Sequence, residues 1–194
     1  MRFVDRTDAG RKLARALEQE TFDPAQLVVL GLARGGVEVA AEVARHFDAP
    51  LDVLVVRKIG SPYQPELAVG AVAPEGVRVV NDEIVESLKI SESRLAQLAE
   101  RARQELGRKL QTYRGERQPV ELSGRDVVLV DDGLATGATM RAAVEYVRNE
   151  GVDRLIVAVP VGSHGSCDRI RREVDRLVCL TRPSLFFGVG QAYD

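Results

Sequence analysis

The chain has 194 residues, of which 45% are hydrophobic and 29% are charged, so it can bury the core of an ordinary domain and global disorder is not expected. Its 27 Lys and Arg residues and 29 Asp and Glu residues give a net charge of −2, and no basic surplus indicates nucleic-acid binding.

No apolar run approaches the roughly 20 residues of a membrane helix. The charged N-terminus lacks the apolar region of a signal peptide. Cys167 and Cys179 lack metal-ligand spacing and do not indicate an oxidising compartment. We therefore expect a cytoplasmic protein with no membrane or nucleic-acid partner.

Strands and helices alternate along most of the chain. Apolar runs rich in β-branched residues predict strands, and apolar residues spaced by three or four predict helices. The expected helices are 8–19, 37–47, 139–149 and 167–174, and the expected strands are 27–32, 51–56, 127–130, 155–161 and 177–180. A hairpin is expected where residues 68–73 and 77–80 flank a Pro-Glu-Gly turn. Continuous apolar strands that alternate with helices indicate an α/β fold with a parallel sheet flanked by helices.

Residues 82–118 do not follow this alternation. Ser91 is a plausible N-cap, and apolar residues then recur every three or four positions as far as Tyr113. This pattern predicts a long helix preceded by a short one at 82–89. Its narrow apolar stripe fits a helical insertion that packs on the core or on a second subunit. A lid over an active site is the other interpretation, because long insertions often carry function.

The stretch "VVLVDDGLATGATM" at 127–140 carries the clearest chemical signal. It places Asp131 and Asp132 at the carboxyl end of a predicted buried strand, where ligands bind in open α/β sheets. Two buried carboxylates without partners would cost several kcal/mol, so they need hydroxyl donors, a cation or solvent. The turn that follows offers backbone N–H groups at the start of a helix, which favours anions, and Thr136 and Thr139 add hydroxyls. A ribose 5-phosphate would satisfy both halves of this pattern.

The same stretch resembles the phosphoribosyl-diphosphate (PRPP) signature of the type I phosphoribosyltransferases. The resemblance implies their fold over a single domain of residues 1–194, with a small hood and with residues 82–118 as an insertion. It implies that Asp131 and Asp132 are catalytic and hold the ribose hydroxyls. The loop residues implied to bind the 5-phosphate are Ala135, Thr136, Gly137, Ala138 and Thr139. Gly133 departs from the family, which usually has an aliphatic residue there, and this should loosen the loop.

Two basic segments resemble the diphosphate-binding parts of the family. The motif "ARGG", Ala33, Arg34, Gly35 and Gly36, follows the first core strand, where the family often has a non-trans peptide, here Ala33–Arg34. Its glycines would let the backbone approach a diphosphate, and its arginine would supply charge. Arg57 and Lys58 close the second predicted strand, where the family often places a basic residue. An ordinary turn and a solvated basic pair are the alternatives.

The acceptor side is less defined. The C-terminal "SLFFGVGQAYD" resembles the hood segment that covers the acceptor base, so Phe186 and Phe187 are candidates to wall in a flat ring. His164 follows the 155–161 strand on the family's acceptor side and has a pKa suited to proton transfer. Glu66 resembles a residue beside the family's catalytic loop. Core positions for the aromatic residues and surface positions for His164 and Glu66 are the alternatives.

The resemblance implies transfer of a 5-phosphoribosyl group from PRPP to a nitrogenous base, with Mg²⁺ held mainly by PRPP oxygens and, through water, by Asp131 and Asp132. The 6-oxopurine branch has an acidic residue at the position of Ala135, which counts against hypoxanthine or guanine, while adenine stays open. The alternative is a PRPP- or nucleotide-sensing regulator without turnover. A dinucleotide-binding enzyme is disfavoured because no G-x-G-x-x-G follows the first strand. We expect a homo-oligomer, most simply a dimer.

Overall fold

The computed structural model describes residues 2–65, 67–115 and 117–194. It divides into two compact units. Unit 1 comprises Met1–Leu54, Pro119–Gly137 and Val147–Asp194, and unit 2 comprises Val55–Gln118 and Ala138–Tyr146. Among the described helices, none is long and apolar enough to cross a membrane.

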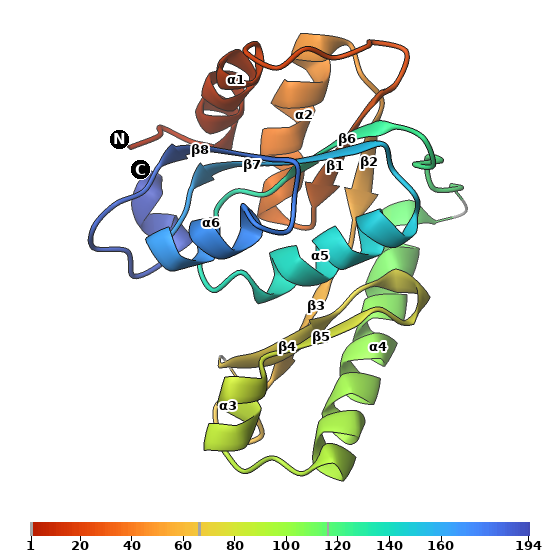
Figure 1. Cartoon of the computed structure of the whole chain (residues 1–194), viewed down its shortest axis with the longest axis vertical. Helices are drawn as coiled ribbons and strands as arrows, with labels where there is room; N and C mark the ends of the chain where they lie inside the picture. Colours follow the sequence, from red (N-terminus) through yellow and green to blue (C-terminus); the bar gives the residue numbers. More distant parts are fainter. Residues whose placement is uncertain (1, 66, 116) are drawn as a thin grey trace. The chain divides into compact units, whose positions relative to one another are not determined.

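Unit 1 contains a parallel sheet of five strands in the order β2-β1-β6-β7-β8 (Figure 1). The strands are β1 Leu27–Leu32, β2 Leu51–Leu54, β6 Asp126–Val130, β7 Arg154–Val161 and β8 Arg176–Thr181. Every residue of β1 is buried, as expected for a central strand with both faces covered. The predicted parallel α/β sheet is therefore confirmed, and the carboxyl ends of β1 and β6 lie at the same edge.

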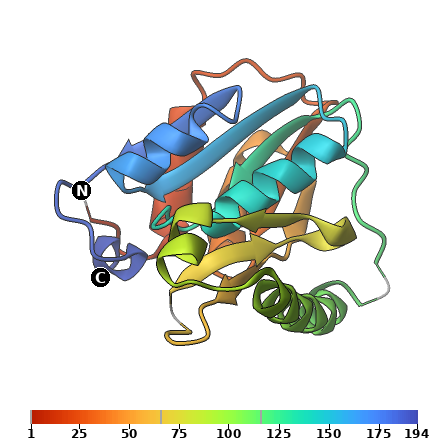
Figure 2. The same ribbon diagram turned by 60° about the horizontal axis from the view of Figure 1, so that its bottom comes forward.

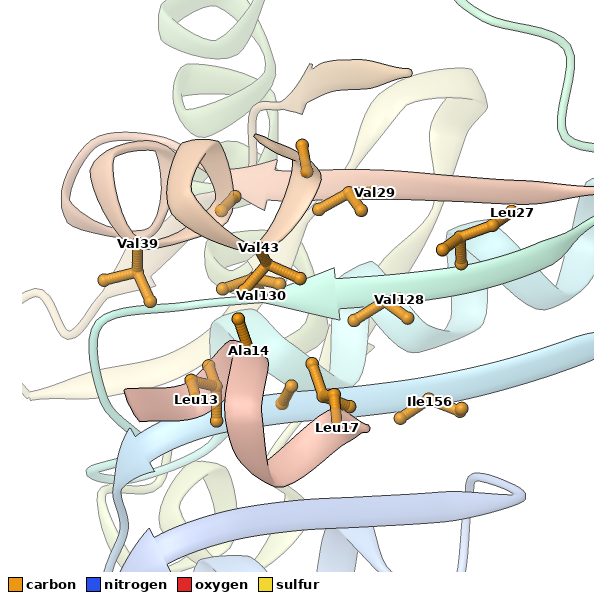
Figure 3. Packing of buried hydrophobic residues seen from close by; sticks show 13 residues of the cluster. Leu13, Ala14, Leu17, Leu27, Val29, Val39, Val43, Val128, Val130 and Ile156 are labelled. Atoms are coloured by element: carbon orange, nitrogen blue, oxygen red, sulfur yellow. The ribbon is translucent and has the colours of Figure 1, made fainter. Parts of the chain in front are cut away.

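Helices α1 (Arg6–Leu17) and α2 (Gly35–Phe47) pack on one face of this sheet (Figure 3). Asp5 caps the N-terminus of α1, because its side chain accepts a hydrogen bond from the Asp8 backbone N–H at 2.7 Å. The helical spacing of its apolar residues then directs one face onto the sheet. Helix α6 (His164–Ile170) lies on the other face (Figure 1). Layers on both faces explain why the strands read as unbroken apolar runs.

The two ends of the chain pair with each other in unit 1. The Phe3 N–H donates to the Ala192 carbonyl at 2.7 Å, and the Asp194 N–H donates to the Phe3 carbonyl at 3.0 Å. The Phe3 side chain is fully buried and packs near the short 3-10 helix Val189–Ala192. A small hood built from both chain ends, as predicted, thus adjoins the sheet.

Unit 2 contains a three-stranded antiparallel sheet in the order β3-β4-β5 and a long helix that runs beside it (Figure 2). Its elements are β3 Arg57–Gly60, β4 Ala68–Val72, a 3-10 turn at Pro74–Gly76, β5 Arg78–Val80, α3 Asp82–Ser87 and α4 Glu92–Arg114. The predicted hairpin and the predicted helices are present. Ser91 caps α4, because its side chain accepts a hydrogen bond from the Arg94 N–H at 3.3 Å. Helix α5 (Ala138–Asn149) runs from unit 2 into unit 1.

The predicted strand 51–56 is wrong in its second half. Strand β2 ends at Leu54, and Arg57 and Lys58 begin the separate strand β3 instead of closing β2. The break has no signal in the residue pattern, because Val55 and Val56 are both buried and continue the apolar run. Burial alone therefore does not distinguish one long strand from two strands in different sheets.

The packing of α1 yields a stability prediction. Leu17→Ala should lower the free energy of unfolding by about 2–5 kcal/mol, because the Leu17 side chain is fully buried in the α1–α2–sheet cluster. Urea denaturation followed by circular dichroism measures the change. Arg15→Ala, at an exposed position of the same helix, is the matched control and should change stability by less than about 0.5 kcal/mol. Equal effects of the two substitutions would contradict the packing of α1 on the sheet.

Candidate active site

The turn after β1 lies directly against the two aspartates after β6. A Cβ atom at Gly35 would lie 2.0 Å from Asp132 Oδ2, and a Cβ at Gly36 would lie 2.8 Å from Asp131 Cα. No other residue fits at either position without displacing the acids. The Ala33–Arg34 peptide that precedes the glycines is cis, as the resemblance implied. The structure thus joins the predicted diphosphate turn and the predicted ribose acids in one place.

Residues near both ends of the chain form hydrogen bonds with Asp132. Arg6 donates from Nε and Nη2 to Asp132 Oδ2 at 2.9 and 2.7 Å, and the carboxylate side chain is 16% exposed. The Tyr193 hydroxyl donates to the Asp132 carbonyl at 2.6 Å, and the Arg6 guanidinium lies 5.2 Å from the centre of the Tyr193 ring. The hydrogen bond with Asp132 raises the pKa of Arg6. Burial, followed by the Asp132 charge, raises the pKa of Tyr193. Sequence reasoning missed both residues, since neither belongs to a local motif.

Asp131 is in a different electrostatic state. Its Oδ1 accepts a hydrogen bond from the Asp132 backbone N–H at 2.8 Å. Burial raises the pKa of Asp131 well above 3.8, and the neighbouring Asp132 carboxylate raises it further. The neutral form of Asp131 is therefore favoured over a wider pH range than in an ordinary aspartate, and the pair is not two equivalent carboxylates.

Hydrogen bonds to the end of β7 and to the start of α6 hold the predicted 5-phosphate loop in place. The Leu134 N–H donates to the Val161 carbonyl at 2.8 Å, which ties the loop to the end of β7. The hydroxyls of Ser163 and Ser166 donate to the Ala135 carbonyl at 2.9 and 2.5 Å. Thr136 is exposed, and Gly137 has a φ of +82°, a left-handed conformation that favours glycine. Helix α5 begins at the next residue, so the loop leads directly into a helix N-terminus.

Gly133 is not loose, contrary to the expectation from its departure from the family pattern. The residue is buried, and a Cβ placed on it would lie 2.7 Å from both γ-methyl groups of Val189. The C-terminal segment therefore fills the space that a side chain would occupy. The glycine at this position and the packing of Val189 depend on each other.

The three predicted acceptor residues are placed differently from one another. Phe186 is half-buried against the Phe3 cluster and lines a cavity of about 250 Å³ in unit 1. That cavity is lined by Arg2, Val161, Thr181, Pro183, Leu185, Phe186, Gln191 and Ala192. Phe187 is 82% exposed and His164 is exposed at the start of α6, and neither lines the cavity. The structure thus places one of the three at a cavity. Glu66 lies outside the described residues.

Unit 2 has a basic cavity of its own, of about 300 Å³, between β3 and α4. It is lined by Arg57 and Lys58 and by Arg94 and Arg101 of α4. Arg57 forms an ion pair with Glu105 at 2.5 Å. Arg94 and Arg101 have no carboxylate within ion-pair distance among the described residues. Sequence reasoning missed these two arginines, although their i, i+7 spacing puts them on one helix face.

The raised pKa of Asp131 gives a pH-dependent prediction. A neutral Asp131 contributes its full stability below the unfolded pKa near 3.8, and this contribution is lost as the pH rises through the higher folded pKa. Asp131→Asn keeps the acceptor oxygen and cannot ionise. Its stability relative to the parent protein should therefore increase as the pH rises from about 4 through the higher folded pKa, as measured by urea denaturation at a series of pH values. A difference that stays constant or falls with pH would contradict the assignment.

Comparison with known proteins agrees with this geometry. The family model of the phosphoribosyl transferase domain matches residues 5–194. A protein from Mycobacterium tuberculosis, named as a proposed phosphoribosyl transferase, is 48% identical to this chain over 191 residues. These residues are 98% of this chain and 43% of that protein. The chain thus spans less than half of that relative's length.

Solved structures show the same fold. The crystal structure of TT1426 from Thermus thermophilus is 44% identical, covers 100% of this chain and 90% of that chain, and has a TM-score of 0.82. A hypoxanthine-guanine phosphoribosyltransferase from Bacillus anthracis shares the fold at 15% identity, with a TM-score of 0.51 over 93% of this chain and 81% of that one. From the family match the chain belongs to the phosphoribosyl transferase domain family, and the structural likenesses show the type I phosphoribosyltransferase fold.

Proposed function

We propose that this protein transfers the 5-phosphoribosyl group of PRPP to a nitrogenous base and releases diphosphate. The observation that carries the proposal is the direct contact between the Gly35–Gly36 turn and the acids Asp131 and Asp132. PRPP has a diphosphate on the carbon next to a ribose hydroxyl, so a site for it needs a diphosphate turn beside hydroxyl acceptors. The loop that anchors at Leu134 then supplies the place for the 5-phosphate.

The acids would act on the ribose. Displacement at the anomeric carbon builds positive charge on the ring, and an ionised Asp132 close to the ring hydroxyls favours that charge. Arg6 keeps this carboxylate oriented through two hydrogen bonds to Oδ2. A protonated Asp131 can donate to a ribose hydroxyl oxygen, while Asp132 can accept from a hydroxyl. The two acids would therefore have complementary hydrogen-bonding roles.

The 5-phosphate would bind to the loop formed by Ala135, Thr136, Gly137, Ala138 and Thr139. Backbone N–H groups at the start of α5 favour an anion, and the threonine hydroxyls can donate to phosphate oxygens. The Ala135 carbonyl is already bonded to two serine hydroxyls, which orients the loop before a ligand arrives. Preorganisation of this kind lowers the entropy lost on binding.

The diphosphate would bind to Ala33, Arg34, Gly35 and Gly36, assisted by Arg57 and Lys58. The basic cavity of unit 2, with Arg94 and Arg101, supports a role for that unit in neutralising a polyanion. The described residues contain no group of three or more His, Cys, Asp or Glu side chains arranged to hold a metal ion. They fit Mg²⁺ bound mainly to PRPP oxygens with Asp131 and Asp132 contacting it through water. Bound Mg²⁺ would neutralise charge on the leaving diphosphate.

The acceptor would be a flat nitrogenous base, and the cavity lined by Phe186 is the candidate for it in unit 1. The cavity volume of about 250 Å³ can accommodate a flat nitrogenous base, and the aromatic side chain of Phe186 in its wall favours stacking. Ala135 cannot exchange a proton with a 6-oxopurine, so an adenine-like or other base fits better. His164 and Phe187 are exposed and would have to move to contact a base in this cavity.

The second candidate function is a PRPP- or nucleotide-sensing protein of the same fold that does not turn over its ligand. The Arg6 ion pair favours this alternative, because a guanidinium at 2.7 Å offsets the negative charge that would stabilise the transition state. Isothermal titration with PRPP and Mg²⁺ tests binding, and a screen of bases for diphosphate release separates the two functions. A homodimer, with residues 82–118 as a subunit contact or a lid, remains part of the proposal.

Substitution of Asp132 should reduce rate more than binding. Asp132→Asn keeps the size and removes the charge, so the affinity for PRPP should fall less than the rate of diphosphate release. Titration calorimetry gives the affinity, and single-turnover kinetics gives the rate. If Asp132→Asn binds and transfers as the parent protein does, the ribose assignment is wrong.

Thr136→Val is the matched comparison for the 5-phosphate. The substitution removes the exposed hydroxyl that would contact the 5-phosphate, and PRPP and ribose 5-phosphate both carry that group. The affinity for each ligand should therefore fall by about 1–2 kcal/mol, roughly five- to thirtyfold in Kd. Calorimetric titration with each ligand measures this. A loss confined to PRPP would move Thr136 away from the 5-phosphate.

The basic residues should distinguish PRPP from ribose 5-phosphate. Neutralising Arg34 or Lys58, or Arg101 in the same cavity as Lys58, should weaken PRPP by about 1.5–3 kcal/mol and ribose 5-phosphate far less, because only PRPP carries the diphosphate. Arg103→Ala is the control on α4, since Arg103 pairs with Glu100 and does not line the cavity. Equal weakening of both ligands would place these residues elsewhere.

A further inference from the structure

Cys167 of α6 and Cys179 of β8 bring two free thiols into contact inside unit 1. The Cys167 S–H donates to Cys179 Sγ, and the two sulfur atoms are 3.7 Å apart. A disulfide needs a separation of about 2.05 Å, so the sulfurs must approach by about 1.7 Å. The elements are neighbours, and no large rearrangement is needed to bring the thiols together.

The two thiols differ in the way that a reactive pair requires. Cys179 is half-buried on the edge strand of the sheet, whereas Cys167 is fully buried. The hydrogen bond from Cys167 and the positive charge of Arg182 lower the pKa of Cys179 to about 7, so its thiolate forms at a lower pH than that of an ordinary thiol. The same hydrogen bond, together with burial, raises the pKa of Cys167. Cys179 therefore has the properties of an attacking thiolate and Cys167 those of a resolving thiol.

The backbone that covers this pair also holds the 5-phosphate loop. A Cβ on Gly162 would lie 2.4 Å from Cys167 Sγ, 3.4 Å from Cys179 Sγ and 3.3 Å from Leu134 Cβ. Gly162 forms a parallel bridge with Leu134, and the next N–H, that of Ser163, donates to the Leu134 carbonyl at 2.9 Å. Ser166, adjacent to Cys167, donates its hydroxyl to the Ala135 carbonyl. A shift of the Cys167 sulfur therefore acts on the segment that supports the loop.

We propose that Cys167 and Cys179 are a site of oxidation by peroxides, and that the disulfide formed there weakens the binding of 5-phosphorylated ribose to the adjacent loop. The Cys179 thiolate attacks one oxygen of hydrogen peroxide, the O–O bond breaks, and hydroxide leaves as Cys179 becomes a sulfenic acid. The Cys167 sulfur then attacks the Cys179 sulfur, the S–O bond breaks, and the second hydroxide leaves with the Cys167 proton as water. Two thiols and one peroxide thus give one disulfide and two waters.

The ligand readout of this proposal rests on the proposed function, while the disulfide itself does not. The test treats the full chain with hydrogen peroxide and measures the intact mass and the non-reducing peptide map. A loss of two hydrogens and a peptide that joins Cys167 to Cys179 are expected, and both should revert with dithiothreitol. Oxidation of Cys179 to the sulfinic acid without a disulfide would overturn the pairing.

Titration calorimetry with ribose 5-phosphate then compares the reduced, oxidised and re-reduced protein. Oxidation should weaken binding by about fivefold or more, and re-reduction should restore it. Cys167→Ser and Cys179→Ser should each keep the affinity of the reduced protein after peroxide, and the double variant controls for oxidation elsewhere. A disulfide that leaves the affinity unchanged would overturn the coupling. If the reduced protein does not bind ribose 5-phosphate at all, the proposed function fails, and the mass measurement still decides whether the disulfide forms.

Discussion

The parallel pairing of β1 with β6 is the constraint on which the candidate site depends. Leu27 is paired with Asp126 and Gly31 with Val130, so the two strands end at the same level of the sheet. The backbone turns that follow them must therefore share one small space. Gly35 and Gly36 relieve that crowding, since a Cβ at either position would displace one of the two acids. The chemistry of the site follows from the register of its two central strands.

This crowding also explains why the acids are unequal. Asp131 lies against the Gly36 turn, where burial raises its pKa even though the Asp132 backbone N–H donates to its Oδ1. Asp132 points to the side where Arg6 can approach it. Two adjacent ionised carboxylates would repel each other, whereas one neutral and one ion-paired acid avoid that cost. Under the proposed function, the same arrangement would supply one donor and one acceptor for ribose hydroxyls.

Much of the fold and the local parts of the site could be predicted from sequence. The parallel sheet followed from apolar runs, and Asp131, Asp132, Gly35 and Gly36 followed from short motifs whose spacing carries their chemistry. Arg6 and Tyr193 could not be predicted in the same way, because their contacts with Asp132 span 126 and 61 residues of sequence. The start of β3 was missed because a buried run continues through the boundary. Arg94 and Arg101 are seven residues apart and so lie on one face of their helix, but charged residues on helix faces exposed to solvent commonly show the same spacing.

The dependence of Asp132 on both chain ends has a consequence for how the site forms. Phe3 pairs with Ala192 and Asp194, and this pairing brings Arg6 to the carboxylate of Asp132 and Tyr193 to its carbonyl. Val189, from the same C-terminal segment, packs on Gly133 at the start of the phosphate loop. The sheet alone therefore brings the acids and glycines together, but the docking of the ends fixes the orientation of Asp132. Contacts between segments that are distant in sequence form at a higher entropic cost than local contacts. The contacts of Arg6 and Tyr193 with Asp132 are therefore the part of the site most easily lost when the chain ends separate.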